Sequence, residues 1–397
     1  MQAKQVYLQP LFKQHNDNHL RLVASTSLAP LLQKFQSVSA ILANTMDTLL
    51  SILVSFFSAY LAFTNSLADQ IDDWWLHMTE SGTVANLTEV PSAYQSIPQI
   101  LLENPAYQQA NVIGGTADEN ATTSIESALV NVFCTYTTPS ARRAVTGTGF
   151  FIDSQGVIMT NAHVAQFLLL PDESGSADCV IRTGSPAVAT YTVDILYLPP
   201  AWILKNAALI SATRPEGTGE RDYAMLYVNG ALNNQPIPRS FPSLAYNTSL
   251  LSHGIVDSPV TAAGYPAQTL FAQDAYQAAL VPRVASTSVT ELMTFGSNFA
   301  DVMSLSGTAI GEQGSSGGPV LNADNTVIGL ISTRGDDSAF GTGSLRAVTL
   351  SYIDRTIQEE TGYTLQQNLQ GDLPLRSRLF KDTLAPFLRG YLIRELQ

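Results

Sequence analysis

Short apolar runs, separated by glycine, proline and small polar residues, dominate the chain from about residue 124 onward. Runs of roughly four to eight residues that end in turn residues are typical of β-strands. We predict strands at 130–136, 149–153, 157–160, 180–183, 191–197, 224–228, 260–263 and 327–332. Ser154-Gln155-Gly156 joins the second strand to the third as a hairpin. Short strands at this density indicate a β-sandwich or β-barrels.

Helices are predicted at only three places in this region, 162–169, 350–360 and 376–396. The last of these lies in an amphipathic tail, residues 366–397, in which arginine and lysine alternate with leucine and phenylalanine. Such a helix can dock on the body of its own protein, join protomers or contact a membrane. We favour docking, and the sequence leaves the oligomeric state open.

The N-terminal third has a different pattern. Thr48 to Thr64 carries no charge, basic residues prevail in 1–36, and acidic residues follow the apolar run. A spanning helix needs about 20 apolar residues, so 17 lies at the short limit. The asymmetry of charge predicts a cytoplasmic segment over 1–36, a transmembrane or signal-like helix over 37–66 and a linker over 67–124. A soluble helix over 37–66 is the third interpretation.

On this interpretation the membrane is a partner through 37–66, and the rest of the chain lies outside the cytoplasm, periplasmic or extracellular, or is secreted if the helix is cleaved. Such a location would make a disulfide between Cys134 and Cys179, the only two cysteines, plausible. The sequence contains no cluster of cysteine and histidine residues with the spacing of metal ligands, so it predicts no metal site. A net charge of −13 in 397 residues argues against nucleic-acid binding.

The loop from Gly311 to Gly318 holds Ser316 among four glycines. Glycine permits a sharp turn and leaves backbone N–H groups unshielded, as a nucleophilic serine with an oxyanion hole requires. The same composition also suits an ordinary tight turn, so the loop decides nothing by itself. A serine nucleophile needs a base. His163 is the one histidine in a suggestive place, directly after the predicted strand 157–160.

Three motifs together carry a family resemblance: Thr-Gly-Thr-Gly-Phe-Phe-Ile-Asp at 146–153, Gly-Val-Ile-Met-Thr-Asn-Ala-His-Val at 156–164 and Gly-Ser-Ser-Gly-Gly-Pro at 314–319. They resemble the trypsin-like serine peptidases of the chymotrypsin fold, and most of all the bacterial high-temperature-requirement type, without a PDZ domain after the peptidase domain. Over residues 125–365 the resemblance implies an all-β fold of two six-stranded antiparallel β-barrels with a C-terminal helix. We expect a helical N-terminal extension to precede it.

The resemblance also implies roles for individual residues. Ser316 would be the nucleophile and His163 its base. The third member should lead an apolar strand between them, and Asp222 fits this position better than the runner-up, Asp194. Backbone N–H groups of Gly314 and Ser316 would bind the oxyanion. No cofactor is implied.

Substrate contacts follow from the same comparison. The strand through Ser332 and Thr333 would pair with the substrate backbone, and Ser332 would also support Asp222. Ile310, six residues before the nucleophile, would supply an apolar floor to the specificity pocket, which disfavours basic side chains. Ser315 stands where related enzymes carry aspartate or asparagine. A zymogen switch at 112–115 is therefore not expected.

The leading hypothesis is a serine endopeptidase that cleaves peptides or proteins through an acyl-enzyme. An inactive protease-fold protein that binds peptides or serves as a scaffold is the alternative. The complete set of His163, Asp222 and Ser316 argues against it, because a binding module does not need all three. A hydrolase of esters or other acyl substrates is the third possibility.

Overall fold

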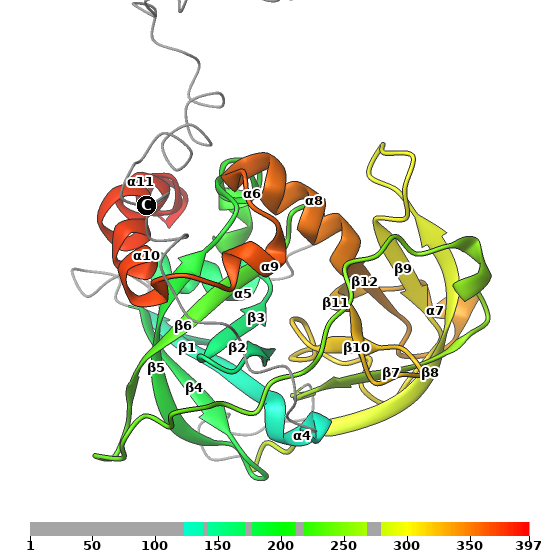
Figure 1. Ribbon diagram of the computed structural model, residues 1–397, viewed down its shortest axis with the longest axis horizontal. Coiled ribbons are helices and arrows are strands. Elements are labelled where there is room, and N and C mark those ends of the chain that lie inside the picture. The colour runs from blue at the N-terminus through cyan, green and yellow to red at the C-terminus, as the bar shows by residue number, and fades with distance from the viewer. Residues whose placement is uncertain (1–122, 138–141, 171–176, 212–217, 268–278, 397) are drawn as a thin grey trace, which may run out of the picture. The chain divides into compact units, whose positions relative to one another are not determined.

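The computed structural model describes residues 123–137, 142–170, 177–211, 218–267 and 279–396 (Figure 1). The predictions for 1–36 and 37–66, nearly all of the linker 67–124 and the glycine pair at 112–115 lie outside these ranges. Within them, no helix has both the length and the apolar character needed to cross a membrane. The predicted 37–66 helix therefore stays a prediction.

Six strands close into the first barrel in the order β1-β2-β3-β6-β5-β4, and every neighbouring pair is antiparallel. Tight turns join some of them; Gly156, between β2 and β3, has a φ of +93°, which favours glycine. The strands are β1 Leu129–Thr137, β2 Arg142–Asp153, β3 Val157–Thr160, β4 Ala177–Thr183, β5 Val188–Tyr197 and β6 Ala224–Ala231.

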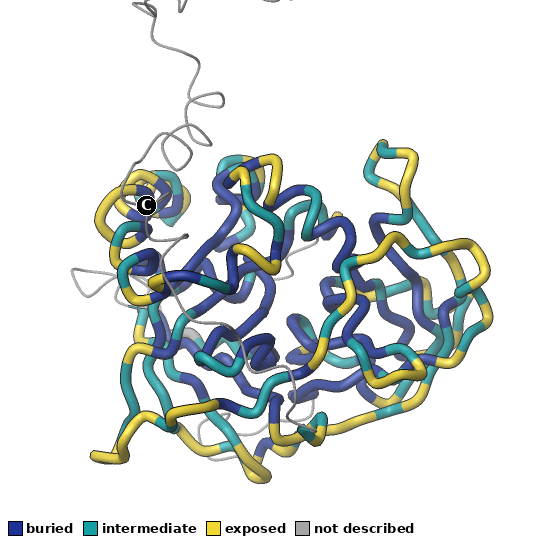
Figure 2. Tube along the Cα trace, in the orientation of Figure 1, coloured by how far each residue is buried: buried dark blue, intermediate teal, exposed yellow. Residues whose placement is uncertain are grey.

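The second barrel closes in the order β10-β11-β12-β9-β8-β7, again antiparallel throughout. Its strands are β7 Pro259–Gly264, β8 Arg283–Met293, β9 Val302–Leu305, β10 Pro319–Leu321, β11 Val327–Arg334 and β12 Leu345–Thr349. The expected fold of two six-stranded barrels is confirmed. In Figure 2, buried residues concentrate where the barrels face each other, and exposed residues lie mainly in the outer loops.

Four strands of the second barrel, β8, β9, β10 and β12, are not among the strands predicted from the sequence. In β8 only Val289 is fully buried, and most of its other residues are small or polar and partly exposed. A strand with so little apolar pattern forms because its neighbours β7 and β9 supply hydrogen-bonding partners on both sides. Its own sequence does not reveal it.

Helices within and between the barrels are short: α4 Ile125–Ala128, α5 Ala162–Ala165, α6 Pro200–Asn206 and α7 Asp337–Phe340, with 3-10 turns η1 Gln166–Leu169, η2 Ala207–Ser211 and η3 His253–Ile255. The helix predicted at 162–169 is therefore α5 continued by η1. The turn α6 to η2 was not predicted.

The chain ends in helices that return to the first barrel. They are α8 Leu350–Thr361, α9 Leu365–Asn368, α10 Leu373–Leu379, a π-helical turn η5 Phe380–Leu384 and α11 Ala385–Leu396. Phe380, Leu384 and Leu388 are fully buried. Arg389 Nε donates to the Leu169 carbonyl, 2.8 Å away, and Ser377 Oγ donates to the Ile195 carbonyl at 3.2 Å. The tail is docked on the body.

Cys134 on β1 and Cys179 on β4 are register partners and form a disulfide. Pairing of β1 with β4 is the contact that closes the first barrel. The bond therefore ties the two ends of a six-stranded sheet together. The two cysteines are 45 residues apart in sequence. Closing a loop of this length lowers the chain entropy of the unfolded state and so stabilises the folded one.

Replacing both cysteines, as Cys134→Ala/Cys179→Ala, is expected to lower the free energy of unfolding by about 2–4 kcal/mol. Urea denaturation of the oxidised wild type and the double variant measures this difference. Reductant should lower the wild-type midpoint toward that of the variant and leave the variant unchanged. Equal midpoints without reductant would contradict the prediction.

Candidate active site

Asp222 and His163 meet at the end of the first barrel where β3 and β6 lie side by side. His163 is in α5, which follows β3, and Asp222 lies two residues before β6. Thr160 of β3 pairs with Ala224 of β6, so both side chains leave the sheet at the same edge. Asp222 Oδ1 accepts from the His163 backbone N–H at 2.9 Å, and Oδ2 is 2.8 Å from Nδ1.

The second barrel contributes another donor to the same carboxylate. Ser332 Oγ, from β11, donates to Asp222 Oδ2 at 2.7 Å. Asn161 Nδ2 donates to the Asp222 backbone carbonyl at 2.8 Å. The Asp222 residue is only 3% exposed. A carboxylate buried this deeply needs such donors, and it receives them from both barrels.

The His163 side chain is 23% exposed, so one edge of the ring reaches solvent. Burial lowers the pKa of His163, but the negative charge of Asp222 and its hydrogen bond to Nδ1 raise it by more. The net pKa is above the ordinary value of 6.5. With Nδ1 held by Asp222, Nε2 is the nitrogen left to exchange a proton with another group.

Ser316 lies opposite this pair, in the loop before β10. Its Oγ donates to the Ser332 carbonyl at 3.3 Å, and its own carbonyl accepts from the Thr148 N–H at 2.7 Å. Within the described residues Oγ makes no hydrogen bond to His163. Such bonds are often long in enzymes without substrate and shorten on binding.

Gly314 and Ser316 present their N–H groups without a protein acceptor in the described part of the chain. Gly314 has a φ of +98°, and an added Cβ would lie 2.6 Å from the Tyr265 carbonyl. Its carbonyl is turned away from the N–H groups and accepts from Thr148 Oγ1 at 2.6 Å. The two N–H groups are therefore available to an anionic oxygen.

Thr148 was not singled out from the sequence, although it belongs to the Thr-Gly-Thr-Gly motif. Its hydroxyl, besides binding Gly314, accepts from the Tyr265 N–H at 2.9 Å. Its carbonyl accepts from Thr160 Oγ1 at 2.7 Å. Thr148 thus connects the serine loop to β3. The motif was the available signal, but its pattern alone does not say which hydroxyl faces the second barrel.

Ser315 and Ile310 are both fully buried. Ser315 Oγ donates to the Ile310 carbonyl at 2.5 Å, so the position before Ser316 is satisfied inside its own loop. The Ile310 side chain packs in the core of the second barrel, with Val260, Val289 and Met303 among its neighbours in that cluster. Ile310 is therefore part of the apolar core of the second barrel.

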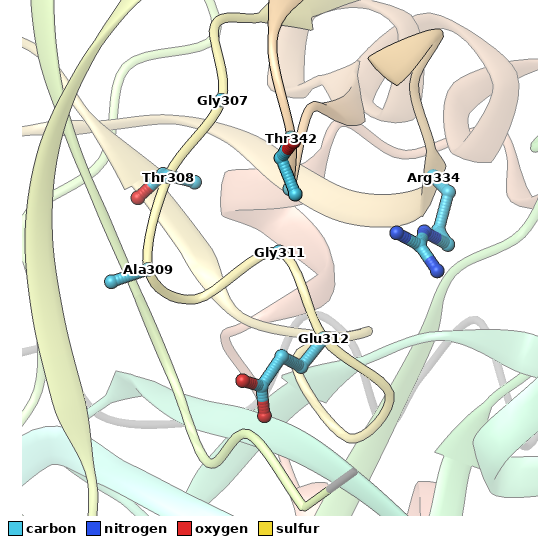
Figure 3. A pocket seen from close by; sticks show the side chains of 8 residues that line it. Gly307, Thr308, Ala309, Gly311, Glu312, Arg334 and Thr342 are labelled. Carbon is cyan, nitrogen blue, oxygen red and sulfur yellow. The ribbon is translucent and has the colours of Figure 1, made fainter.

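A cavity of about 780 Å³ opens beside the serine loop, and Figure 3 shows the side chains around it. It is lined by Gly307, Thr308, Ala309, Gly311, Glu312, Arg334, Thr342 and Gly343. Ile310 is not among these lining residues, which are mainly glycine and threonine with two opposite charges, and its role as the floor of a specificity pocket stays a prediction. Arg334 also contacts Asp337, 2.9 Å away on the exposed side.

The remaining candidates are placed as follows. Thr333 lies on β11 and pairs with Arg346 of β12. Asp194, the runner-up carboxylate, lies on β5 and contacts Lys381 of the tail at 3.2 Å instead of His163. Among the residues that the structure describes, no group of three or more His, Cys, Asp or Glu side chains could hold a metal ion.

Residues 147–330 match the family model described as the trypsin-like peptidase domain. No curated protein matches the chain. Among solved structures, the active form of the Rv3671c protease from M. tuberculosis is 18% identical, with a TM-score of 0.37, over 71% of this chain and 96% of that one. A Glu endopeptidase in complex with MPD is 12% identical, with a TM-score of 0.36, over 63% and 97%.

Neither structural similarity supports a statement about substrate. Resemblance to the high-temperature-requirement type has no support among these matches and stays a prediction. The family match spans the first barrel from β2 onward and reaches β11 of the second, and it includes His163, Asp222 and Ser316. Residues 147–330 of this chain thus match a trypsin-like peptidase domain, and they contribute most of the strands of its two six-stranded barrels.

Proposed function

We propose that the chain is a serine endopeptidase that uses His163, Asp222 and Ser316 as a catalytic triad. The observation that carries the proposal is the convergence of three features between the barrels. These are a histidine ring fixed by a buried aspartate, a serine hydroxyl opposite it, and two backbone N–H groups without protein acceptors. Acyl transfer requires this combination of base, nucleophile and oxyanion donors.

In the proposed reaction Ser316 Oγ attacks the scissile carbonyl while His163 Nε2 takes its proton. Asp222 keeps the ring in the tautomer with a proton on Nδ1 and stabilises the imidazolium that forms. The developing oxyanion accepts from the N–H groups of Gly314 and Ser316, an interaction worth about 3 kcal/mol per donor in related chemistry. His163 then returns the proton to the leaving amine, and water hydrolyses the acyl-enzyme.

We further propose that the domain works outside the cytoplasm. The Cys134–Cys179 disulfide supports this location, because disulfides persist mainly in oxidising compartments. Attachment to a membrane through 37–66 remains part of the same proposal. A hydrolase of small esters uses the same residues, so activity on peptides and on acyl esters should be compared directly.

Labelling with a fluorophosphonate tests the nucleophile. Wild-type protein should label, and Ser316→Ala should not, because the probe reacts only with an activated serine hydroxyl. Peptidase activity should fall by about 10⁴–10⁶-fold in the same variant. Ser338→Ala, which alters an exposed serine at the start of α7, should label like the wild type. A folded wild type that fails to label would favour the scaffold alternative.

The pH dependence tests the pairing of His163 with Asp222. Only neutral His163 can accept the Ser316 proton, so kcat/KM should rise as pH increases through an apparent pKa above 6.5. Asp222→Asn removes the charge that raises this pKa. The acid limb should then move to lower pH, and kcat should fall by about 10⁴-fold. A limb that stays in place in Asp222→Asn would contradict the assignment.

The cavity beside the serine loop is proposed to receive a substrate side chain. Glu312→Gln should lower kcat/KM for substrates with a basic residue at that position, and Arg334→Gln should lower it for acidic ones. Each change should be about 3–10-fold, since both charges are partly solvated. Peptide libraries varied at the residue before the scissile bond provide the measurement. If both variants and the wild type prefer the same side chains at this position, the cavity is not the binding site of that side chain.

A further inference from the structure

Residues on both sides of Asp222 are held by one face of α8, the helix that follows the second barrel. Arg221 pairs through one guanidinium nitrogen with Glu360, and its backbone N–H donates to Tyr352 Oη at 3.2 Å. On the other side, Tyr223 Oη lies 2.8 Å from Thr356 Oγ1. Tyr352, Thr356 and Glu360 are spaced four apart, so they share a face of the helix.

The partners in this contact are buried, which makes them costly to leave unpaired. Glu360 is 6% exposed, and its second carboxylate oxygen accepts from Tyr197 Oη of β5. Tyr223 is fully buried. Burial raises the pKa of Glu360, whereas the charge of Arg221 opposes that rise and favours the ionised form. A charged pair in such a site binds firmly when intact and is strongly disruptive when one member is lost.

The Arg221–Glu360 pair holds a backbone conformation that would otherwise be unfavourable. Arg221 has a φ of +56°, in the left-handed region that non-glycine residues seldom adopt. Such a conformation persists only where the surroundings hold it. The turn also places the Asp222 N–H on the Gly219 carbonyl, 3.1 Å away, and so sets the direction from which the Asp222 side chain reaches His163.

We infer that Arg221 with Glu360, and Tyr223 with Thr356, are positioning residues, and that α8 acts through both pairs to orient Asp222 toward His163. This inference rests on the proposed triad. The second barrel thus reaches Asp222 by two routes: directly through Ser332 Oγ, and indirectly through α8, which follows β12 and crosses to the first barrel (Figure 1). In the described part of the chain, neither Arg221 nor Glu360 contacts the side chain of His163 or Ser316.

Glu360→Gln tests the inference, with Glu359→Gln as its matched control. Both glutamates bind the Arg221 guanidinium, but Glu359 does so from a side chain that is 62% exposed. Glu360→Gln should lower kcat about 10-fold with KM within about twofold of wild type. It should also move the acid limb of kcat/KM to lower pH, because a displaced Asp222 raises the pKa of His163 less. Glu359→Gln should leave both unchanged.

A purely structural role predicts lower stability in Glu360→Gln with no change in the acid limb. If Glu360→Gln folds and has the kcat of the wild type and the same acid limb of kcat/KM, the inference is overturned. If this variant does not fold, Thr356→Val provides the test, since it releases Tyr223 with little change in volume. It should lower kcat about threefold and move the limb in the same direction. Unchanged values in Thr356→Val also overturn the inference.

NMR titration of the His163 ring in a Ser316→Ala background separates this inference from the proposed activity. A wild type that neither labels with a fluorophosphonate nor cleaves peptides refutes the proposed function alone. The ring should still titrate at lower pH when Glu360→Gln is added to Ser316→Ala, and not when Glu359→Gln is added. If the His163 ring titrates at the same pH in Ser316→Ala and in its combinations with Glu360→Gln and with Glu359→Gln, the positioning role is refuted. The proposed activity is not affected by that result.

Discussion

A buried carboxylate must be surrounded by donors, and the arrangement of this molecule follows from how Asp222 obtains them. His163 supplies two, from its backbone and its ring, and Ser332 supplies one from the other barrel. Because these donors belong to separate barrels, Asp222 is satisfied only when the barrels are correctly apposed. The same apposition brings Ser316 Oγ to the Ser332 carbonyl, so assembly of the fold and assembly of the site are one event.

Close backbone packing sets the other half of the site. An added Cβ on Gly317 would lie 1.9 Å from the Thr148 carbonyl, which only glycine avoids. Thr148 in turn binds the Gly314 carbonyl and the Ser316 carbonyl. The serine loop is therefore held against β2 of the first barrel, and in the described part of the chain the N–H groups of Gly314 and Ser316 have no protein acceptor. Electrostatic stabilisation of an oxyanion depends on this fixed orientation, since donors that had to reorganise would contribute less.

The C-terminal helices make polar contacts with residues of the first barrel that are far away in sequence. Arg221 and Glu360 are 139 residues apart, and Arg389 reaches the Leu169 carbonyl at the end of the helical segment that carries His163. Both contacts return the end of the chain to the barrel that supplies His163 and Asp222. The C-terminal helices are thus more than a cover for apolar surface, because their polar contacts lie beside the segments that carry His163 and Asp222.

Local sequence determined the hairpin before α5, the glycine-rich loop around Ser316, the chain order of histidine, aspartate and serine, and hence the resemblance to a family. These features depend on residues adjacent in the chain, where turn chemistry and apolar spacing are visible. The sequence favoured Asp222 over Asp194, and the tertiary structure placed Asp222 beside His163 and Asp194 beside Lys381. Tertiary structure alone decided the rest: it buried Ile310, paired the polar strand β8 with its neighbours and joined Arg221 to Glu360. Burial and charge pairing depend on residues far apart in sequence, so no local pattern encodes them.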